Sequence, residues 1–341
     1  MTDEAAALLC RLRRLARLSL TRVRAISSYG WATLLARLPQ LSSLGRCDCL
    51  PEALGHLDRH VSHVSRSRDQ LSLGHVECEA PIMESDLERI TSLCPDLCHV
   101  RLVYRPQEAD TERLRGHEEI NTWPHLTKLK RLTSLSELSL VSADFYNHSL
   151  FSAIKDLGPR RLTRLELEDC DEMNVNSLLI IGDSCPRLSS LTLSGCHFNV
   201  DSEERARISE ICSLQTQSKA LFRNLREVNF KFSSPVHLIM MKLPLHFAHN
   251  LSSFSLDLLD QSLDDSFITT LMSWSSWQCL TSFKVTNCPG LGLMSANSVI
   301  GACPSIQVLG ALSSWGLIDN IQLSSFIKEI RSRNYDIRID R

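Results

Sequence analysis

Two segments near the middle of the chain repeat one spacing of apolar residues at an offset of 26 residues. Segments 162–170 and 188–196 both have leucine at relative positions 1, 4 and 6 and cysteine at position 9. In a strand, alternate side chains point to opposite sides, so Leu191 and Leu193 face a core while Thr192 faces away. A unit this short cannot bury its apolar edge alone, and the pattern therefore predicts stacked parallel strands.

Weaker copies of the spacing extend over almost the whole chain, with a mean period of about 29 residues. Position 1 of the other units falls at Leu15, Leu41, Arg68, Leu97, Leu135, Leu225, Leu251, Leu280, Ile306 and Asn334. A period of this length leaves room for a helix on the outer side of most turns, and the apolar residues of 54–64 have helical spacing. We expect one right-handed α/β solenoid over 1–341, with about eleven or twelve turns, parallel strands on the concave face and helices on the convex face.

The third unit and the last unit are the weakest copies of the pattern. In the third unit Leu71 and Leu73 take positions 4 and 6. In the last unit Ile337 and Ile339 take them. Their registers therefore rest on only two apolar residues each.

Two steps between units are longer than the others. One separates Leu97 from Leu135 by 38 residues and carries a charged stretch with Trp123, which predicts a loop or a short extra helix. The other separates Leu188 from Leu225 by 37 residues and favours a lengthened outer helix. Insertions in repeat proteins either mark a binding face or are tolerated surface loops.

The segment 185–196 reads CPRLSSLTLSGC and matches the pattern CPxLxxLxLxxC at every fixed position. Cys94-Pro95 and Cys303-Pro304 open two further units in the same way. On these residues the chain resembles the cysteine-containing leucine-rich repeats, and in particular the repeat half of F-box proteins. The resemblance implies substrate recognition within a cullin-based ubiquitin ligase, with the Skp adaptor and cullin as partners if a full-length form carries an F-box.

The chain departs from F-box proteins at its start. An F-box is a helical segment, usually ahead of the repeats, that opens with a Leu-Pro pair and carries a tryptophan near its end. Here Leu15 already opens a repeat, and Trp31 precedes Leu38-Pro39 rather than following it. We therefore expect no F-box segment within the chain. Two interpretations stay open: an N-terminally incomplete F-box protein, or a stand-alone scaffold or inhibitor-like binding protein with no ligase link.

Composition limits the classes of partner and the cellular compartments that are expected for this chain. The formal net charge of −2 disfavours a dedicated nucleic-acid binder, and no apolar run reaches the roughly 20 residues that cross a bilayer. The start of the chain is a poor secretory signal, because Asp3 and Glu4 precede the first cation. Seven of the 13 cysteines fall on repeat positions, which favours reduced thiols in the cytoplasm or nucleus. Glycosylation sequons at Asn147 and Asn250 argue the other way, but such triplets are common by chance.

The outward positions of each strand, numbers 3, 5, 7 and 8, predict the surface that a protein partner would use. Arginine and exposed aromatic residues anchor many protein interfaces, whereas the alternative is an ordinary solvated strand face. The partner-binding candidates on this concave face are Arg101, Tyr104, Arg164, Glu166, Glu168, Asp169, Lys231, Phe232 and Lys284. Tyr104 and Phe232 are the expected bulky anchors, and the loop around Trp123 is the second choice.

Other candidate chemistry is weaker. His56, His60 and His63 share one helix face near Cys47 and Cys49 and could ligate zinc, but the apolar stripe of that helix favours solvated surface histidines. The arginines between 11 and 24 form a basic patch that the neighbouring leucines tie to the first repeat. The sequence contains no glycine-rich phosphate loop, HExxH or nucleophile elbow, so we expect neither catalysis nor a cofactor or metal.

Overall fold

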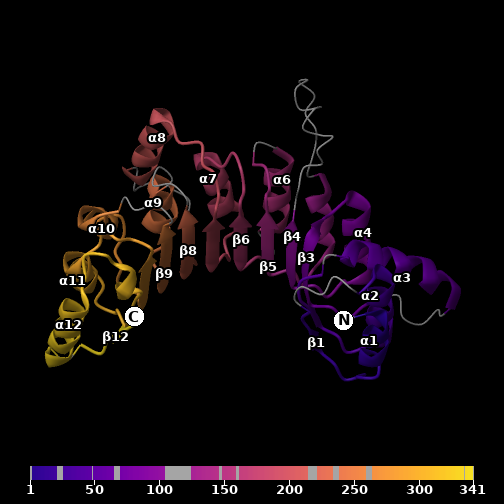
Figure 1. The fold of residues 1–341 in the computed structure, drawn as a ribbon. Helices are drawn as coiled ribbons and strands as arrows, with labels where there is room; N and C mark the ends of the chain where they lie inside the picture. The colour runs from indigo at the N-terminus through magenta and orange to yellow at the C-terminus, as the bar shows by residue number, and fades with distance from the viewer. Residues whose placement is uncertain are drawn as a thin grey trace. The chain divides into compact units, whose positions relative to one another are not determined.

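The computed structural model forms two compact units, Met1–Leu162 and Thr163–Arg341. It describes residues 2–20, 26–47, 49–64, 70–103, 124–145, 148–158, 161–213, 221–232, 238–258, 263–333 and 335–340. Each unit alternates strands with helices, and its helices lie along one side of its strands (Figure 1). One continuous solenoid over 1–341 stays a prediction.

In the first unit, neighbouring strands pair in parallel in chain order. The strands are β1 (Arg17–Leu18), β2 (Ser43–Leu44), β3 (His75–Pro81), β4 (His99–Val103) and β5 (Glu137–Val141). The helices are α1 (Asp3–Leu9), α2 (Ser28–Arg37), α3 (Leu50–Val64), α4 (Glu84–Leu93), the 3₁₀ helix η1 (Pro124–Arg131) and α6 (His148–Leu157).

The second unit has the same organisation, with parallel pairs from β6 to β12. Its strands are β6 (Arg164–Glu168), β7 (Ser190–Ser194), β8 (Glu227–Phe232), β9 (Ser253–Leu258), β10 (Ser282–Thr286), β11 (Val308–Gly310) and β12 (Arg338–Ile339). Its helices are α7 (Val175–Ser184), α8 (Ser202–Ser213), α9 (Leu238–Phe247), α10 (Asp265–Met272), α11 (Leu293–Ala302), η3 (Leu312–Ser314) and α12 (Asn320–Ser332). Among the described residues, no helix is both long and apolar enough to pass through a bilayer.

The two strongest repeats stack in the predicted register. Leu165 pairs with Leu191 and Leu167 with Leu193, and all four side chains are buried. Val228 continues the row on β8. Since the same positions supply the core in successive turns, parallel strands alternating with helices define an α/β leucine-rich-repeat solenoid, which confirms the predicted fold class.

Position 8 decides how a turn leaves its strand. In four units the residue at this position has a positive φ: Ser142, Asp169, Gly195 and Asn287. This left-handed conformation ends the strand and directs the next side chain inward. The inward residues at position 9 are Ala143, Cys170, Cys196 and Cys288, all buried. In these units position 9 therefore holds a small, mostly apolar side chain that fills the core.

The two weakest units were placed in the wrong register. Leu44 pairs with Val76, so Val76 rather than Leu71 holds position 4 of the third unit. Leu309 pairs with Ile339, which moves the last unit by two residues. In the third unit Leu73, Val76 and Cys78 have the same 1, 4, 6 spacing and are all buried.

The two long steps contain extra helical structure in their described parts. Residues 104–123, with Tyr104 and Trp123, lie outside the described residues. The step ends in η1, which fits the predicted short extra helix. The second step contains α8, which confirms the predicted outer helix there.

The cysteines are free thiols, and ten of the thirteen are buried. Burial raises the pKa of Cys94, Cys185 and Cys303 to about 12. Thiols with such a pKa stay protonated near neutral pH and act as small apolar side chains. The burial expected from the repeat positions is therefore confirmed for these three residues.

His246 makes the stability of the second unit depend on pH. Burial lowers the pKa of this imidazole below 6.5, assisted by the charges of His249 and Lys242 and opposed by a hydrogen bond with the backbone of Trp274. The unfolded chain therefore binds a proton here before the folded chain does, and stability falls as pH drops below about 6.5. It stops falling only below the lowered folded pKa.

We expect His246→Gln to flatten this part of the stability profile, measured by urea unfolding between pH 8 and pH 5. His197→Gln serves as the control because His197 is an exposed histidine of the same unit. An equal slope in the His246 variant and the unsubstituted chain would contradict the assignment.

Candidate functional site

The strands of each unit present a face opposite to their buried leucines, called here the strand face. In the first unit, position 3 of three neighbouring strands carries His75, His99 and Glu137, which are paired in register. Position 5 carries Glu77, Arg101 and Ser139 in the same order. Because residues two apart on a strand point to the same side, these six side chains share one side of the sheet, where Ser139 is buried.

Four of these residues, His75, Glu77, His99 and Glu137, form what we call the histidine cluster. His75 Nε2 lies 3.0 Å from Glu77 Oε1, and His99 Nδ1 lies 3.0 Å from Glu137 Oε2. The two imidazole rings stack with their centroids 4.0 Å apart. All four side chains are partly exposed, from 17% for His99 to 39% for Glu137.

The sequence prediction missed this cluster. It placed His99 at an outward position of its strand, but the wrong register put His75 at position 8 of the third unit instead of at position 3 beside His99. A usable signal was present, since a His-Val pair begins the strand segment at both His75 and His99, 24 residues apart. Each valine holds position 4 and is buried, which places the preceding histidine at position 3.

Arg101 is confirmed on the strand face of the first unit. Its Nη1 donates to Ser139 Oγ at 3.0 Å on the neighbouring strand. Arg46 Nε lies 3.9 Å from Glu77 Oε2, so two arginines border the histidine cluster. Tyr104, the expected aromatic anchor of this strand, falls outside the described residues.

The second unit carries the other charged candidates on its strand face. Glu166 and Glu168 lie on β6 and are half-buried, while Lys231 on β8 and Lys284 on β10 are exposed. Arg164 Nη2 lies 3.9 Å from Glu227 Oε2, with both side chains more than half exposed. These side chains point away from the core, as predicted, and their role in partner binding stays a prediction.

Asp169 has a structural task of its own at the end of β6. It occupies position 8 with φ of 50°, and its N–H donates to the Ser194 carbonyl at 2.7 Å. Aspartate tolerates the left-handed conformation better than most residues. A partner would therefore meet this carboxylate at the strand end rather than on the strand itself.

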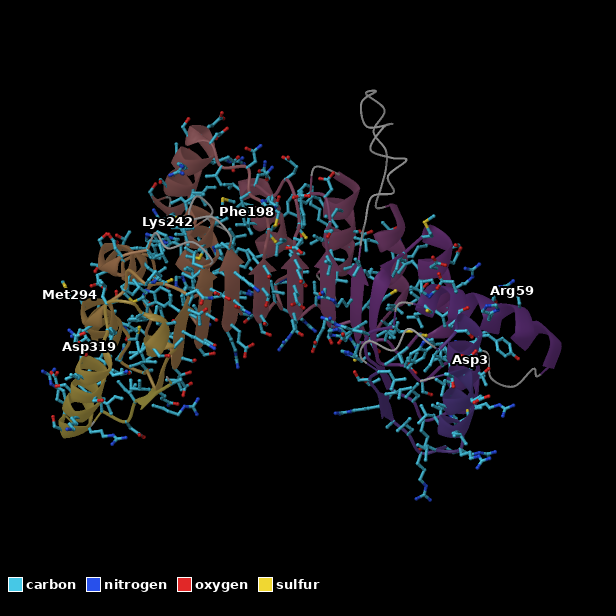
Figure 2. All side chains as sticks on the ribbon, in the orientation of Figure 1. Asp3, Arg59, Phe198, Lys242, Met294 and Asp319 are labelled. Atoms are coloured by element: carbon cyan, nitrogen blue, oxygen red, sulfur yellow. The ribbon has the colours of Figure 1, made fainter. Side chains whose placement is uncertain are left out.

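Phe232 is not an exposed anchor, and its assignment to the partner surface was wrong. The side chain is fully buried. It stacks on Phe230 with centroids 5.6 Å apart and meets the edge of Phe198 at 5.9 Å. Phe198 is labelled in Figure 2. Because β8 remains extended through position 8 instead of turning there, alternation carries Phe232 into the core.

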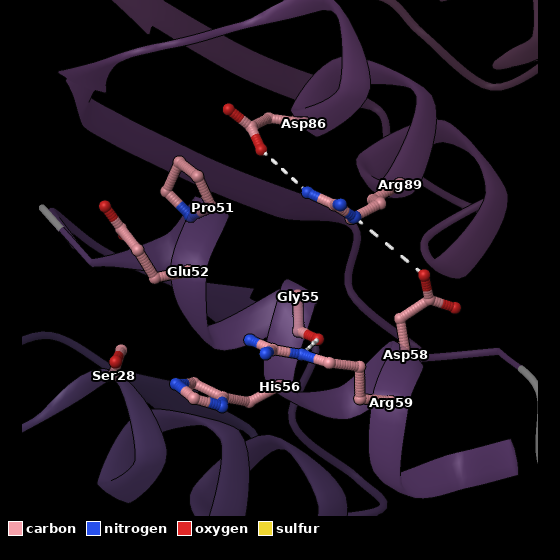
Figure 3. Close-up of a pocket in the computed structure, with 9 residues that line it drawn as sticks. All are labelled: Ser28, Pro51, Glu52, Gly55, His56, Asp58, Arg59, Asp86 and Arg89. Carbon is pink, nitrogen blue, oxygen red and sulfur yellow. Dashed lines mark hydrogen bonds and ion pairs between the residues drawn. The ribbon is translucent and has the colours of Figure 1, made fainter.

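A polar hollow of about 350 Å³ lies between α2, α3 and α4 (Figure 3). Its lining consists of Ser28, Pro51, Glu52, Gly55, His56, Asp58, Arg59, Asp86 and Arg89. Arg89 lies 3.0 Å from Asp86 Oδ1 and 3.8 Å from Asp58 Oδ2, and Arg59 donates to the Gly55 carbonyl at 3.1 Å. These internal pairs use much of the lining charge, so the hollow is a weak candidate for a ligand site.

Of the three α3 histidines proposed as zinc ligands, His56 alone has a described side chain. His56 is half-buried, with its ring 6.1 Å from that of Tyr29, and the side chains of His60 and His63 lie outside the description. Among described side chains, the group of three or more potential metal ligands that converges is His75, Glu77 and His99.

The fold and its charged strand face place the chain among leucine-rich-repeat solenoids. No family model and no curated protein matches the chain. A chain of the crystal structure of the Rad7 and Elc1 complex in yeast is similar over 95% of this chain and 85% of its own length. The identity is 14% and the TM-score 0.46, a level of similarity that supports no inference about function.

Proposed function

We propose that the chain is a protein-binding module that recognises its partner through the strand face. One observation carries the proposal: alternation along β6 to β10 separates a continuous core from an outward row of charged residues. Leu165, Val228 and Phe283 are fully or almost fully buried, whereas Arg164 and Lys231 on the same sheet are exposed. Parallel solenoid strands offer an extended surface of this kind to partners.

The charge on this face differs along the second unit. On β6 the acidic Glu166, Glu168 and adjoining Asp169 outnumber Arg164. Further along, Lys231 shares β8 with Glu227, and Lys284 lies on β10. A partner with the opposite order of charges would be steered into one orientation. Charges at the rim of an interface act mainly on association rate and specificity.

Glu166→Lys is expected to slow association with a partner and to change its dependence on salt. The outward side chain of Glu166 lies on the strand face, so the fold should persist. Association rates at several salt concentrations, measured by surface plasmon resonance, provide the test. Glu210→Lys makes the same charge change on the exposed surface of α8 and should leave association unchanged. Equal rates for the two variants would contradict a role of the strand face.

We further propose that the module is the substrate-recognition part of an F-box-type ubiquitin ligase receptor, acting in the cytoplasm or nucleus. Its support is the resemblance of the segment 185–196 to the cysteine-containing repeats of such receptors. Cysteines stay reduced in the cytoplasm and nucleus, and the ten buried cysteines of this chain form no disulfides, which fits those compartments.

The ligase role is tested by affinity purification of the full-length protein from cells, with detection of the Skp adaptor and cullin. Their reproducible recovery would support it. Their consistent absence, with a strand-face partner still recovered, would remove the ligase link and leave the stand-alone scaffold or inhibitor-like interpretation. The Glu166→Lys variant tests the binding surface separately. If it loses the partner, the strand face binds the partner whether or not the Skp adaptor and cullin are recovered.

A further inference from the structure

The histidine cluster brings metal-binding atoms together on adjacent strands. One nitrogen each from His75 and His99 and one carboxylate oxygen from Glu77 lie within 4.8 Å of one another. The residues belong to β3 and β4, whose parallel pairing fixes His75 directly beside His99. The convergence therefore comes from the rigid part of the first unit and not from a loop.

The kinds of atoms in the cluster match the preferences of zinc. Neutral imidazole nitrogen and carboxylate oxygen bind Zn²⁺ at about 2.0–2.2 Å, and two histidines with one acid can leave a fourth position open. Tetrahedral bonds of that length place ligand atoms roughly 3.3 Å apart. His75 Nε2 and Glu77 Oε1 are already 3.0 Å apart, but the two imidazole rings, which stack at an interplanar angle of 24°, must turn out of the stack before both can bind one ion.

Glu137 supplies the outer contact that such sites use. The His99 Nδ1–H donates to Glu137 Oε2 at 3.0 Å, which leaves Nε2 of the same ring with a free lone pair. Metal-bound histidines usually donate their second nitrogen to a carboxylate in this way, which fixes the ring and its tautomer. Glu137 is thus a positioning residue in this arrangement.

The arginine paired with Glu77 approaches the other oxygen of its carboxylate. Arg46 Nε approaches Glu77 Oε2 at 3.9 Å, whereas His75 contacts Oε1. Arg101 lies beside Glu77 in the ladder, but its Nη1 donates toward β5 at Ser139. The positive charges lower the affinity of a cation without blocking the oxygen that faces the histidines.

We propose that His75, Glu77 and His99 form a binding site for a divalent transition metal, with zinc as the best fit, and that Glu137 positions His99. When the metal binds His75 Nε2, the proton between this atom and Glu77 Oε1 moves to Nδ1 of the same ring, so the imidazole stays neutral and keeps one proton. The site does not depend on the proposed binding of a protein partner.

The direct test is titration of the full chain, stripped of metal with a chelator, with zinc sulfate in an isothermal calorimeter. We expect one zinc per chain. His75→Gln and His99→Gln should each abolish this binding. Glu137→Ala should weaken it by about 10- to 100-fold, the usual effect of losing an outer carboxylate.

Two controls separate the cluster from other zinc-binding groups. His249→Gln removes an exposed histidine from the second unit and should leave the titration unchanged. Cys98 is an exposed thiol next to His99, and its Sγ–H donates to the Gly74 carbonyl at 3.0 Å. Cys98→Ser should therefore retain the site, and cobalt bound in place of zinc should show no thiolate charge-transfer band.

A measurement on the unsubstituted chain covers the case in which a histidine variant fails to fold. In ¹⁵N-histidine NMR, zinc should move the ring nitrogens of two histidines among the 12 in the chain. The proposal is overturned if zinc does not bind, if a folded His75 and His99 double variant binds it equally well, or if the shifted resonances belong to other histidines.

Discussion

Phe232→Ala is expected to lower the free energy of unfolding by about 3–5 kcal/mol, the cost of truncating a buried phenylalanine. The side chain is fully buried between Phe230 and Phe198. Its removal would lose the apolar contacts and the two aromatic pairings, and the rigid strand around it cannot close the cavity. Urea unfolding followed by circular dichroism measures the loss.

The neighbouring residue supplies a matched control for this prediction. Lys231 precedes Phe232 on β8 and is exposed. Lys231→Ala should change stability by no more than about 0.5 kcal/mol, as surface substitutions usually do. If both variants cost the same, β8 does not place its two final side chains on opposite faces.

Trp315→Ala is expected to be equally severe, at about 3–5 kcal/mol. Among the described residues, Trp315 is the largest fully buried side chain, and its Nε1–H donates to the Val285 carbonyl at 2.9 Å. The substitution therefore creates a cavity and also removes a buried hydrogen bond between the η3 turn and β10. Urea unfolding again measures the loss, and hydrogen exchange of the β10 amides shows where the second unit opens.

Two further variants divide the Trp315 effect into its parts. Trp315→Phe keeps an aromatic ring but loses the indole N–H, and should cost about 1–3 kcal/mol for the lost hydrogen bond. Tyr335→Ala removes an aromatic residue that is 48% exposed and should be close to neutral. An alanine variant no less stable than the phenylalanine variant would show that the cavity contributes nothing.

The repeat core could be predicted from sequence because leucines that recur at a fixed spacing mark the buried positions. Leu165 and Leu191 have one role in successive turns, and a regular spacing reveals that role without any knowledge of the surroundings. Where the apolar residues were of mixed type, as at Val76 and Cys78, a second fit five residues away with two leucines was chosen, although it puts Arg68 at position 1. The register then depended on pairing with β2 and β4, which a single sequence does not display.

The main error at the candidate site was to expect every position-8 side chain to point outward. The type of residue at position 8 indicates whether the side chain points outward or into the core. Small or polar residues that tolerate positive φ, such as Gly195 and Asn287, end the strand. The equivalent residues Phe232 and Leu258 are bulky and apolar, and there the strand continues and buries them. The type of side chain at position 8 therefore decides whether the strand ends there or continues.

Trp315 and the histidine cluster escaped prediction for different reasons. Trp315 lies in a turn after β11 and has no counterpart in the other repeats, so periodicity could not assign it. The cluster depends on side chains from three strands meeting across the sheet, and one wrong register was enough to separate His75 from His99.

Because buried cysteines lie in several different turns, the local unfolding of each of these turns can be followed by the reaction of its thiol. Cys94 belongs to the first unit, while Cys185, Cys288 and Cys303 lie along the second, and the pKa of each is raised to about 12. An alkylating reagent attacks the thiolate, so each of these cysteines reacts at neutral pH when its own turn opens. Brief alkylation followed by peptide mass spectrometry would then rank the turns of this solenoid by local stability, without any substitution.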